Sequence, residues 1–120
     1  MTRLAELEVE ERDGVQVARI TGEIDLSNVA DLGDALAAAA GEQPTGLVID
    51  MSGVRHLDSA GVRMAFDLRR RLSARRQELA LAVPADARIR DVLDLAAVSE
   101  TVPLFDDVAD AIAAVAATQA

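Results

Sequence analysis

Apolar and polar residues follow two periodicities along this 120-residue chain, one typical of strands and one typical of helices. Residues 4–11 alternate roughly between apolar and acidic side chains, which predicts a strand with one solvated face. A second strand is predicted over residues 15–20 and ends at Gly22. Asp13-Gly14, between the two strands, is a turn sequence typical of β-hairpins. The chain is therefore predicted to begin with an antiparallel hairpin.

A short, mostly apolar and partly β-branched run marks the centre of the predicted sheet. It covers residues 47–51 and is bounded by Gly46 and by Ser52-Gly53, as expected for a strand that is buried on both faces. Residues 54–58 form a short polar loop, after which helical spacing begins at Ser59. We therefore expect Ser59 at a helix N-terminus, beside the end of the central strand.

The other helices and strands are predicted from the same two periodicities. Helices are predicted from a cap at Ser27 or Asn28 to residue 40, and over residues 86–97 and 106–117, while strands are predicted at residues 77–83 and 101–102. The order ββαβαβαβα predicts one α/β domain over residues 1–120. Its small mixed sheet, with an initial hairpin and parallel central strands, should be packed with about four helices.

Composition narrows the classes of function. The formal charge of −9 repels phosphate backbones and anionic lipid, so we expect neither nucleic-acid nor membrane binding. The chain has no cysteine and one histidine, which leaves no ligand set for a metal centre and indicates no cofactor. The charged N-terminus lacks the apolar core of a signal peptide, and no apolar run reaches the about 18 residues of a membrane span. We expect a cytoplasmic protein whose partners are proteins or small molecules.

The helix that starts at Ser59 sorts into two faces when its residues are placed at helical spacing. The core face carries Gly61, Met64, Ala65, Leu68 and Leu72. The opposite face carries Ser59, Val62, Phe66, Arg63, Arg69 and Arg70. An exposed apolar patch of Val62 and Phe66, rimmed by arginines, has the composition of a protein interface. Alternatively, a loop covers Phe66.

Two other roles for Ser59 come from its position. In the first, Asp58 and Ser59 cap the helix and have no further function. The strand–turn–serine–helix arrangement also resembles the nucleophile elbow of serine hydrolases, but that motif needs glycine two positions before the serine, where this chain has Leu57. The single histidine, His56, lies in the same short loop and supplies no independently placed base. We therefore predict a regulatory protein and not an enzyme.

Four segments together carry a resemblance to a known family. They are GEID at residues 22–25, LVIDMSGV at 47–54, LDSAGV at 57–62, and RDVLDL at 90–95 followed by AAV. This set is similar to the STAS domain of bacterial anti-sigma factor antagonists and covers nearly the whole chain. The Asp-Ser-x-Gly element is fairly specific for that family.

The resemblance implies a protein that binds an anti-sigma factor, often itself a serine kinase, and thereby releases a sigma factor. It makes Ser59 the phosphoacceptor and implies a phosphoserine phosphatase as a further partner. Ala60 stands where many members have Ser or Thr, so Ser59 is the one hydroxyl of the motif. The resemblance places Asp25 on the partner-binding side, and together with the helix pattern it gives Asp25, Asp58, Ala60, Gly61, Val62 and Phe66 as the expected partner-binding residues. The alternative is a STAS subunit of a larger assembly, such as a lipid-transport or stress-signalling complex, in which Ser59 is never phosphorylated.

Electrostatics fits a phosphorylation switch at this serine. Phosphorylation adds about 1.5 to 2 negative charges. The free N–H groups at a helix N-terminus tolerate such an anion locally. We therefore expect the fold to survive phosphorylation, while a partner surface at this site is repelled or must desolvate the phosphate.

Overall fold

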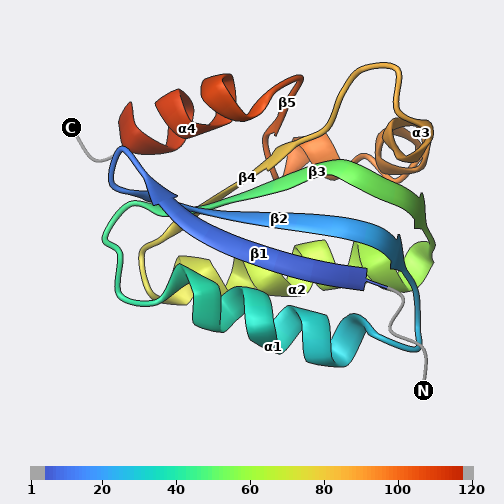
Figure 1. The fold of residues 1–120 in the computed structure, drawn as a ribbon, viewed down its shortest axis with the longest axis horizontal. Coiled ribbons are helices and arrows are strands. Elements are labelled where there is room, and N and C mark those ends of the chain that lie inside the picture. Colours follow the sequence, from blue (N-terminus) through green and yellow to red (C-terminus); the bar gives the residue numbers. More distant parts are fainter. Residues whose placement is uncertain (1–4, 118–120) are drawn as a thin grey trace.

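A five-stranded sheet forms the middle layer of the computed structural model, which describes residues 5–117 (Figure 1). In chain order the elements are β1 (Ala5–Arg12), β2 (Val15–Ile24), α1 (Val29–Ala40), β3 (Gly46–Leu57), α2 (Ser59–Ala74), β4 (Glu78–Ala82), α3 (Arg88–Leu95), the short 3-10 helix η1 (Val98–Glu100), β5 (Leu104–Phe105) and α4 (Val108–Ala117). The strands lie in the order β1-β2-β3-β4-β5. β1 runs antiparallel to β2, and the remaining neighbours are parallel. The predicted mixed α/β fold, with an initial hairpin and about four helices, is confirmed.

The predicted hairpin turn is present between β1 and β2. Asp13 and Gly14 have φ angles of 54° and 78°, and Arg12 pairs directly with Val15. Positive φ at both central residues is the geometry of a type I′ turn, whose twist matches that of the paired strands. This turn sets the register of the edge strand β1.

Helices cover the sheet on both sides (Figure 1). α1 and α2 pack against each other and against one face, and they begin at the same end of the molecule, where β2 and β3 end. Their apolar faces join the sheet in the main core, which includes the fully buried Leu36, Ile49 and Leu72. α4 covers a second cluster on the other face, around Val15 and Val48. The N-terminal ends of α1 and α2 are therefore brought together beside the ends of two strands.

Both central strands are longer than the sequence pattern predicted. β2 does not end at Gly22 but continues to Ile24, and β3 continues through the predicted loop to Leu57. The pairing between them shifts in register at two places, between Arg19 and Thr21 and between Gly22 and Glu23 of β2. Each shift places an extra residue in β3, which interrupts the alternation by which a strand is identified from sequence.

The C-terminal part of the chain also differs in detail. The brief strand predicted at residues 101–102 is wrong, because β5 lies after Pro103. The Leu81 N–H donates to the Pro103 carbonyl at 2.9 Å, whereas Val102 is fully buried and its N–H donates back to Val98 at 2.8 Å. Val102 therefore fills the core and takes no place in the sheet. The predicted bounds of the last two helices and of β4 differ from those observed by no more than two residues, and the last helix ends at residue 117 as predicted.

Candidate functional site

The N-terminus of α2 is capped by Asp58. Its carboxylate Oδ1 accepts hydrogen bonds from the N–H groups of Ala60 at 2.9 Å and Gly61 at 3.2 Å, while its own N–H donates to the Ile24 carbonyl at 3.3 Å. These bonds satisfy N–H groups that a helix start leaves free and tie α2 to the end of β2. The capping role belongs to Asp58. Ser59 is the first residue of the helix, and its side chain is exposed.

Gly61 allows α2 to approach the strands closely. The residue is buried, and a Cβ atom at this position would collide with the side chain of Leu57 and lie 3.0 Å from the Ile24 side chain. Ile24 and Leu57 are the paired last residues of β2 and β3. The glycine of the Asp-Ser-x-Gly motif therefore fixes the height of Ser59 above the ends of the two strands.

The loop between β2 and α1 is ordered by its own side chains. Asp25 Oδ1 accepts hydrogen bonds from the Ser27 N–H at 2.9 Å and from the Ser27 hydroxyl. Asn28 Oδ1 accepts from the Asp25 N–H at 3.1 Å, and its amide group donates to the Glu23 carbonyl at 2.9 Å. At the tip of this loop Leu26 is 79% exposed. A large apolar side chain is thus held in solvent by a loop of fixed shape.

The hydrogen bonds from Ser27 favour the ionised form of Asp25. The side-chain and backbone hydrogen bonds of Ser27, with a smaller contribution from His56, lower the pKa of the Asp25 carboxyl below its ordinary value. A depressed carboxyl pKa stabilises the fold at pH values above the ordinary pKa, and this contribution is lost as the pH falls through the depressed value.

We expect Ser27→Ala to raise the pKa of Asp25 in an NMR titration of the side-chain carboxyl, with Ser52→Ala as the control. An unchanged pKa in Ser27→Ala would contradict the hydrogen-bonded loop.

A groove of about 540 Å³ runs between the N-terminal half of α1 and one side of α2, from Ser59 to Arg71. It is lined by Leu26, Val29, Ala30, Asp34, Asp58, Ser59, Ala60, Arg63, Met64, Asp67 and Arg71, and we call it the Ser59 groove. Its apolar wall comes from α1 and the preceding loop, and its charged wall comes mostly from α2. Within it, Arg71 and Asp34 form a 3.1 Å ion pair that joins the two helices. An exposed hydroxyl therefore lies at the edge of a partly apolar depression.

The structure brings together some of the predicted site residues and separates others. Asp58, Ser59 and Ala60 line the Ser59 groove, and Asp25 lies directly before its residue Leu26. Leu26 itself was missed, although an apolar residue in the middle of the polar turn sequence Asp-Leu-Ser-Asn was a signal that could have revealed it.

The predicted exposed patch of Val62 and Phe66 is wrong. Val62 is 8% exposed and belongs to the main core, and Phe66 is half-buried against that core. The segment after α3 closes this side of α2, since its residues Val98 and Val102 are fully buried in the same cluster. Arg69, from the next turn of α2, donates to the Thr101 carbonyl at 2.8 Å and attaches the segment to the helix. A loop covers this face, which was the alternative interpretation of Phe66.

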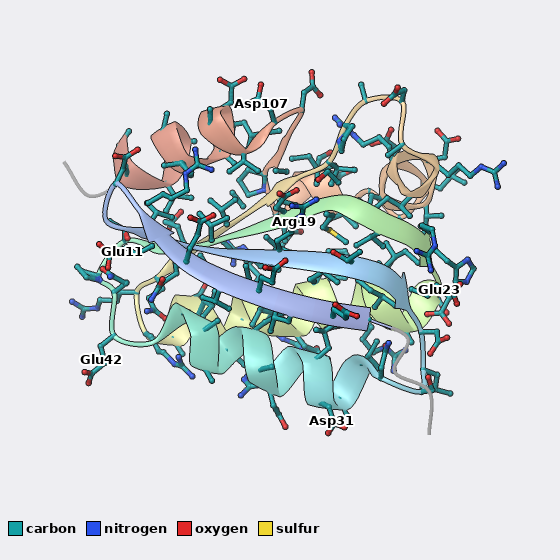
Figure 2. The ribbon with its side chains drawn as sticks, viewed as in Figure 1. Glu11, Arg19, Glu23, Asp31, Glu42 and Asp107 are labelled. Carbon is teal, nitrogen blue, oxygen red and sulfur yellow. The ribbon has the colours of Figure 1, made fainter. Side chains whose placement is uncertain are left out.

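Charge is spread over the surface and is not collected in one site. Acidic side chains extend outward from several elements, as the labelled Glu11, Asp31, Glu42 and Asp107 show (Figure 2). Among residues 5–117 there is no group of three or more His, Cys, Asp and Glu side chains that could hold a metal ion. No helix within that same range is long and apolar enough to cross a membrane.

Comparisons with known proteins agree with this architecture. The STAS domain family model matches residues 6–111. The anti-sigma-F factor antagonist RsfB of Mycobacterium tuberculosis is 43% identical over 56 residues, which are 47% of this chain and 46% of RsfB. The matched region thus spans about half the length of these curated relatives.

Solved structures extend the likeness to nearly the whole chain. An anti-sigma factor antagonist from Mycobacterium paratuberculosis has a TM-score of 0.77 and 31% identity, with 92% of this chain and 93% of that chain covered. A putative anti-sigma factor antagonist from Thermotoga maritima has a TM-score of 0.76 at 17% identity, with 91% and 93% covered, and shares the fold. The chain therefore belongs to the STAS domain family, as do proteins described as anti-sigma factor antagonists.

Proposed function

We propose that this protein is an anti-sigma factor antagonist that binds an anti-sigma factor over the Ser59 groove and is switched off by phosphorylation of Ser59. Two relatives with substantial sequence identity, from M. tuberculosis and M. paratuberculosis, carry the name anti-sigma factor antagonist. The single observation that carries the proposal is the exposed Ser59 hydroxyl on the edge of a groove that also presents the exposed Leu26. We place this reaction in the cytoplasm: the protein binds the anti-sigma factor, and the sigma factor is released as a result.

Leu26 is the apolar anchor of the proposed interface. Burying a leucine side chain stabilises a complex by about 1.5–3 kcal/mol, and 79% of this side chain is available for burial. The hydrogen bonds among Asp25, Ser27 and Asn28 hold the loop in place before binding, which reduces the entropy lost in the complex. Asp25 and Asp58 add negative charge beside the anchor, and this arrangement favours a partner surface with an apolar pocket and basic side chains.

Phosphorylation acts on this interface and not on the fold. A serine kinase, which is the anti-sigma factor itself or a companion of it, transfers the γ-phosphoryl group of ATP to Ser59 Oγ. The new P–O bond replaces the β–γ bridge, ADP leaves, and the hydroxyl proton passes to a base of the kinase. Because Asp58 already caps α2, the added phosphate breaks no hydrogen bond of the cap. It places charge on the edge of the groove that the partner must desolvate, and a phosphoserine phosphatase restores binding.

The experiment that tests the proposal combines capture with reconstitution. The tagged protein is used to capture partners from extract of its own organism, the captured protein is identified by mass spectrometry, and the purified pair is titrated by calorimetry. We expect an anti-sigma factor, and we expect Leu26→Asp to weaken its binding by about 2 kcal/mol or more while the melting temperature is kept. Glu42→Gln, an exposed change at the far end of α1, is the control for affinity.

Two results would contradict the proposal. One is capture of transporter or scaffold subunits in place of an anti-sigma factor, which would favour the STAS subunit of a larger assembly. The other is an anti-sigma factor that binds Leu26→Asp as tightly as the unchanged protein, which would place the interface elsewhere.

A further inference from the structure

The Ser59 groove contains two arginines, and only one of them has an ionic partner. Arg71 is paired with Asp34 at 3.1 Å. Asp67, which also lines the groove, is paired with Arg70 from outside it. Arg63 is exposed, and within residues 5–117 it takes part in no ion pair or side-chain hydrogen bond. The groove therefore holds one uncommitted guanidinium group.

The position of Arg63 on α2 directs this group towards Ser59. The two residues are four positions apart on one helix and line the same groove. At this spacing Cβ atoms are about 5–6 Å apart on the same helix face. Side chains on a helix also lean towards its N-terminus, over the residue four positions earlier. The long arginine side chain can therefore reach a group attached to the Ser59 oxygen without any movement of the backbone.

We propose that Arg63 is the phosphate-binding residue of the phosphorylated protein and holds the Ser59 phosphate across the Ser59 groove. This inference rests on the proposed function, because it concerns the phosphorylated form of Ser59. A guanidinium group offers paired N–H donors that match two phosphate oxygens, and such charge-assisted hydrogen bonds are short and directional. The N–H group of Ser59 itself adds a donor at the start of the helix.

The surrounding charges explain why a cation is needed here. The Asp58 carboxylate precedes Ser59 directly and repels a phosphate, while its own bonds occupy the Ala60 and Gly61 N–H groups. Asp34 from α1 and Asp67 from α2 also face the groove, but each is paired with an arginine. Asp25 lies in the loop beside it and, like any exposed aspartate, is ionised at neutral pH, while the hydrogen bonds from Ser27 lower its carboxyl pKa further. Among the residues that line the groove, Arg63 is the arginine without an ionic partner, so it is the cation left to bind the phosphate.

The proposed contact between Arg63 and the phosphate changes the surface that the partner must bind. A phosphate that is free in solvent can turn away from an approaching surface, whereas a phosphate held by Arg63 stays over the groove. The contact also favours the dianionic form of the phosphate, because the guanidinium group stabilises the more highly charged state. The same residue should slow removal of the phosphate, since a phosphatase must first break the contact with Arg63.

The inference is tested on protein that carries phosphoserine at residue 59 through translational incorporation, so that no kinase is needed. The second pKa of the phosphate is measured by ³¹P NMR titration in the otherwise unchanged protein, in Arg63→Gln and in Arg63→Lys. The control is Arg76→Gln, which removes the same charge from an exposed position just after α2, outside the groove. We expect Arg63→Gln to raise the phosphate pKa by about half a unit, as for an exposed ion pair, with a smaller rise in Arg63→Lys.

Each outcome decides the matter. Equal phosphate pKa values in Arg63→Gln and Arg76→Gln overturn the inference, because the effect is then one of net charge alone. A shift confined to Arg63 supports it, provided that circular dichroism shows an unchanged fold. The proposed function fails separately, when the identified kinase leaves Ser59 without phosphate in intact-mass measurements, and this result does not alter the titration.

Discussion

Replacing Ser59 by Asp is expected to weaken binding of the anti-sigma factor by at least about 2 kcal/mol, while Ser59→Ala binds like the unchanged protein and accepts no phosphate. The reason is electrostatic, because the carboxylate places charge on the edge of the groove, beside Asp58 and close to Leu26. Both variants should fold normally, since Asp58 supplies the cap and Ser59 is exposed. Calorimetric titration gives the affinities, and intact mass follows phosphate incorporation.

The two substitutions separate a switch from a purely structural serine. A serine with only a structural role would leave binding unchanged in Ser59→Asp. Phosphate found on Ser52 or Ser73, with none on Ser59, would assign the switch to another residue. Ser52→Ala is a suitable control, because Ser52 is also exposed but lies outside the groove.

Replacing Phe66 by Asp is expected to lower the free energy of unfolding by at least about 2 kcal/mol. The helix pattern alone predicted the opposite, an exposed residue whose replacement leaves stability unchanged and weakens binding. In the structure Phe66 packs against the main core, so the change removes apolar contacts and places a carboxylate against that core. Urea denaturation followed by circular dichroism measures the loss.

Leu26→Asp is the matched control for this measurement. It makes a similar apolar-to-acidic change at a side chain that is 79% exposed, so its free energy of unfolding should stay within about 0.5 kcal/mol of the unchanged protein. The two variants should therefore have reversed effects, with stability lost in Phe66→Asp and binding lost in Leu26→Asp. A Phe66→Asp variant with unchanged stability would contradict the burial of Phe66. It would then support the exposed position that the helix pattern predicted.

The sequence by itself determined the features that depend on neighbours along the chain. Asp13-Gly14 predicted the hairpin because only a few residue types tolerate positive φ at both turn positions. The order of strands and helices predicted the mixed sheet, and the start of helical spacing placed Ser59 at the first residue of α2. The fold class and the position of the candidate phosphoacceptor could therefore be predicted from patterns among residues that are close in sequence.

Only the tertiary structure decided which side chains are exposed and which meet. Helical spacing puts Phe66 opposite the sheet-facing side of α2, but it contains no information on the segment after α3, which covers that side. It also cannot reveal that α1 and α2 begin together and form the groove that joins Leu26 to Ser59. The extra residues in β3 break the period of two, so the full length of that strand became visible only through its pairing with β2. Contacts between segments distant in sequence depend on packing in three dimensions, which no local pattern records.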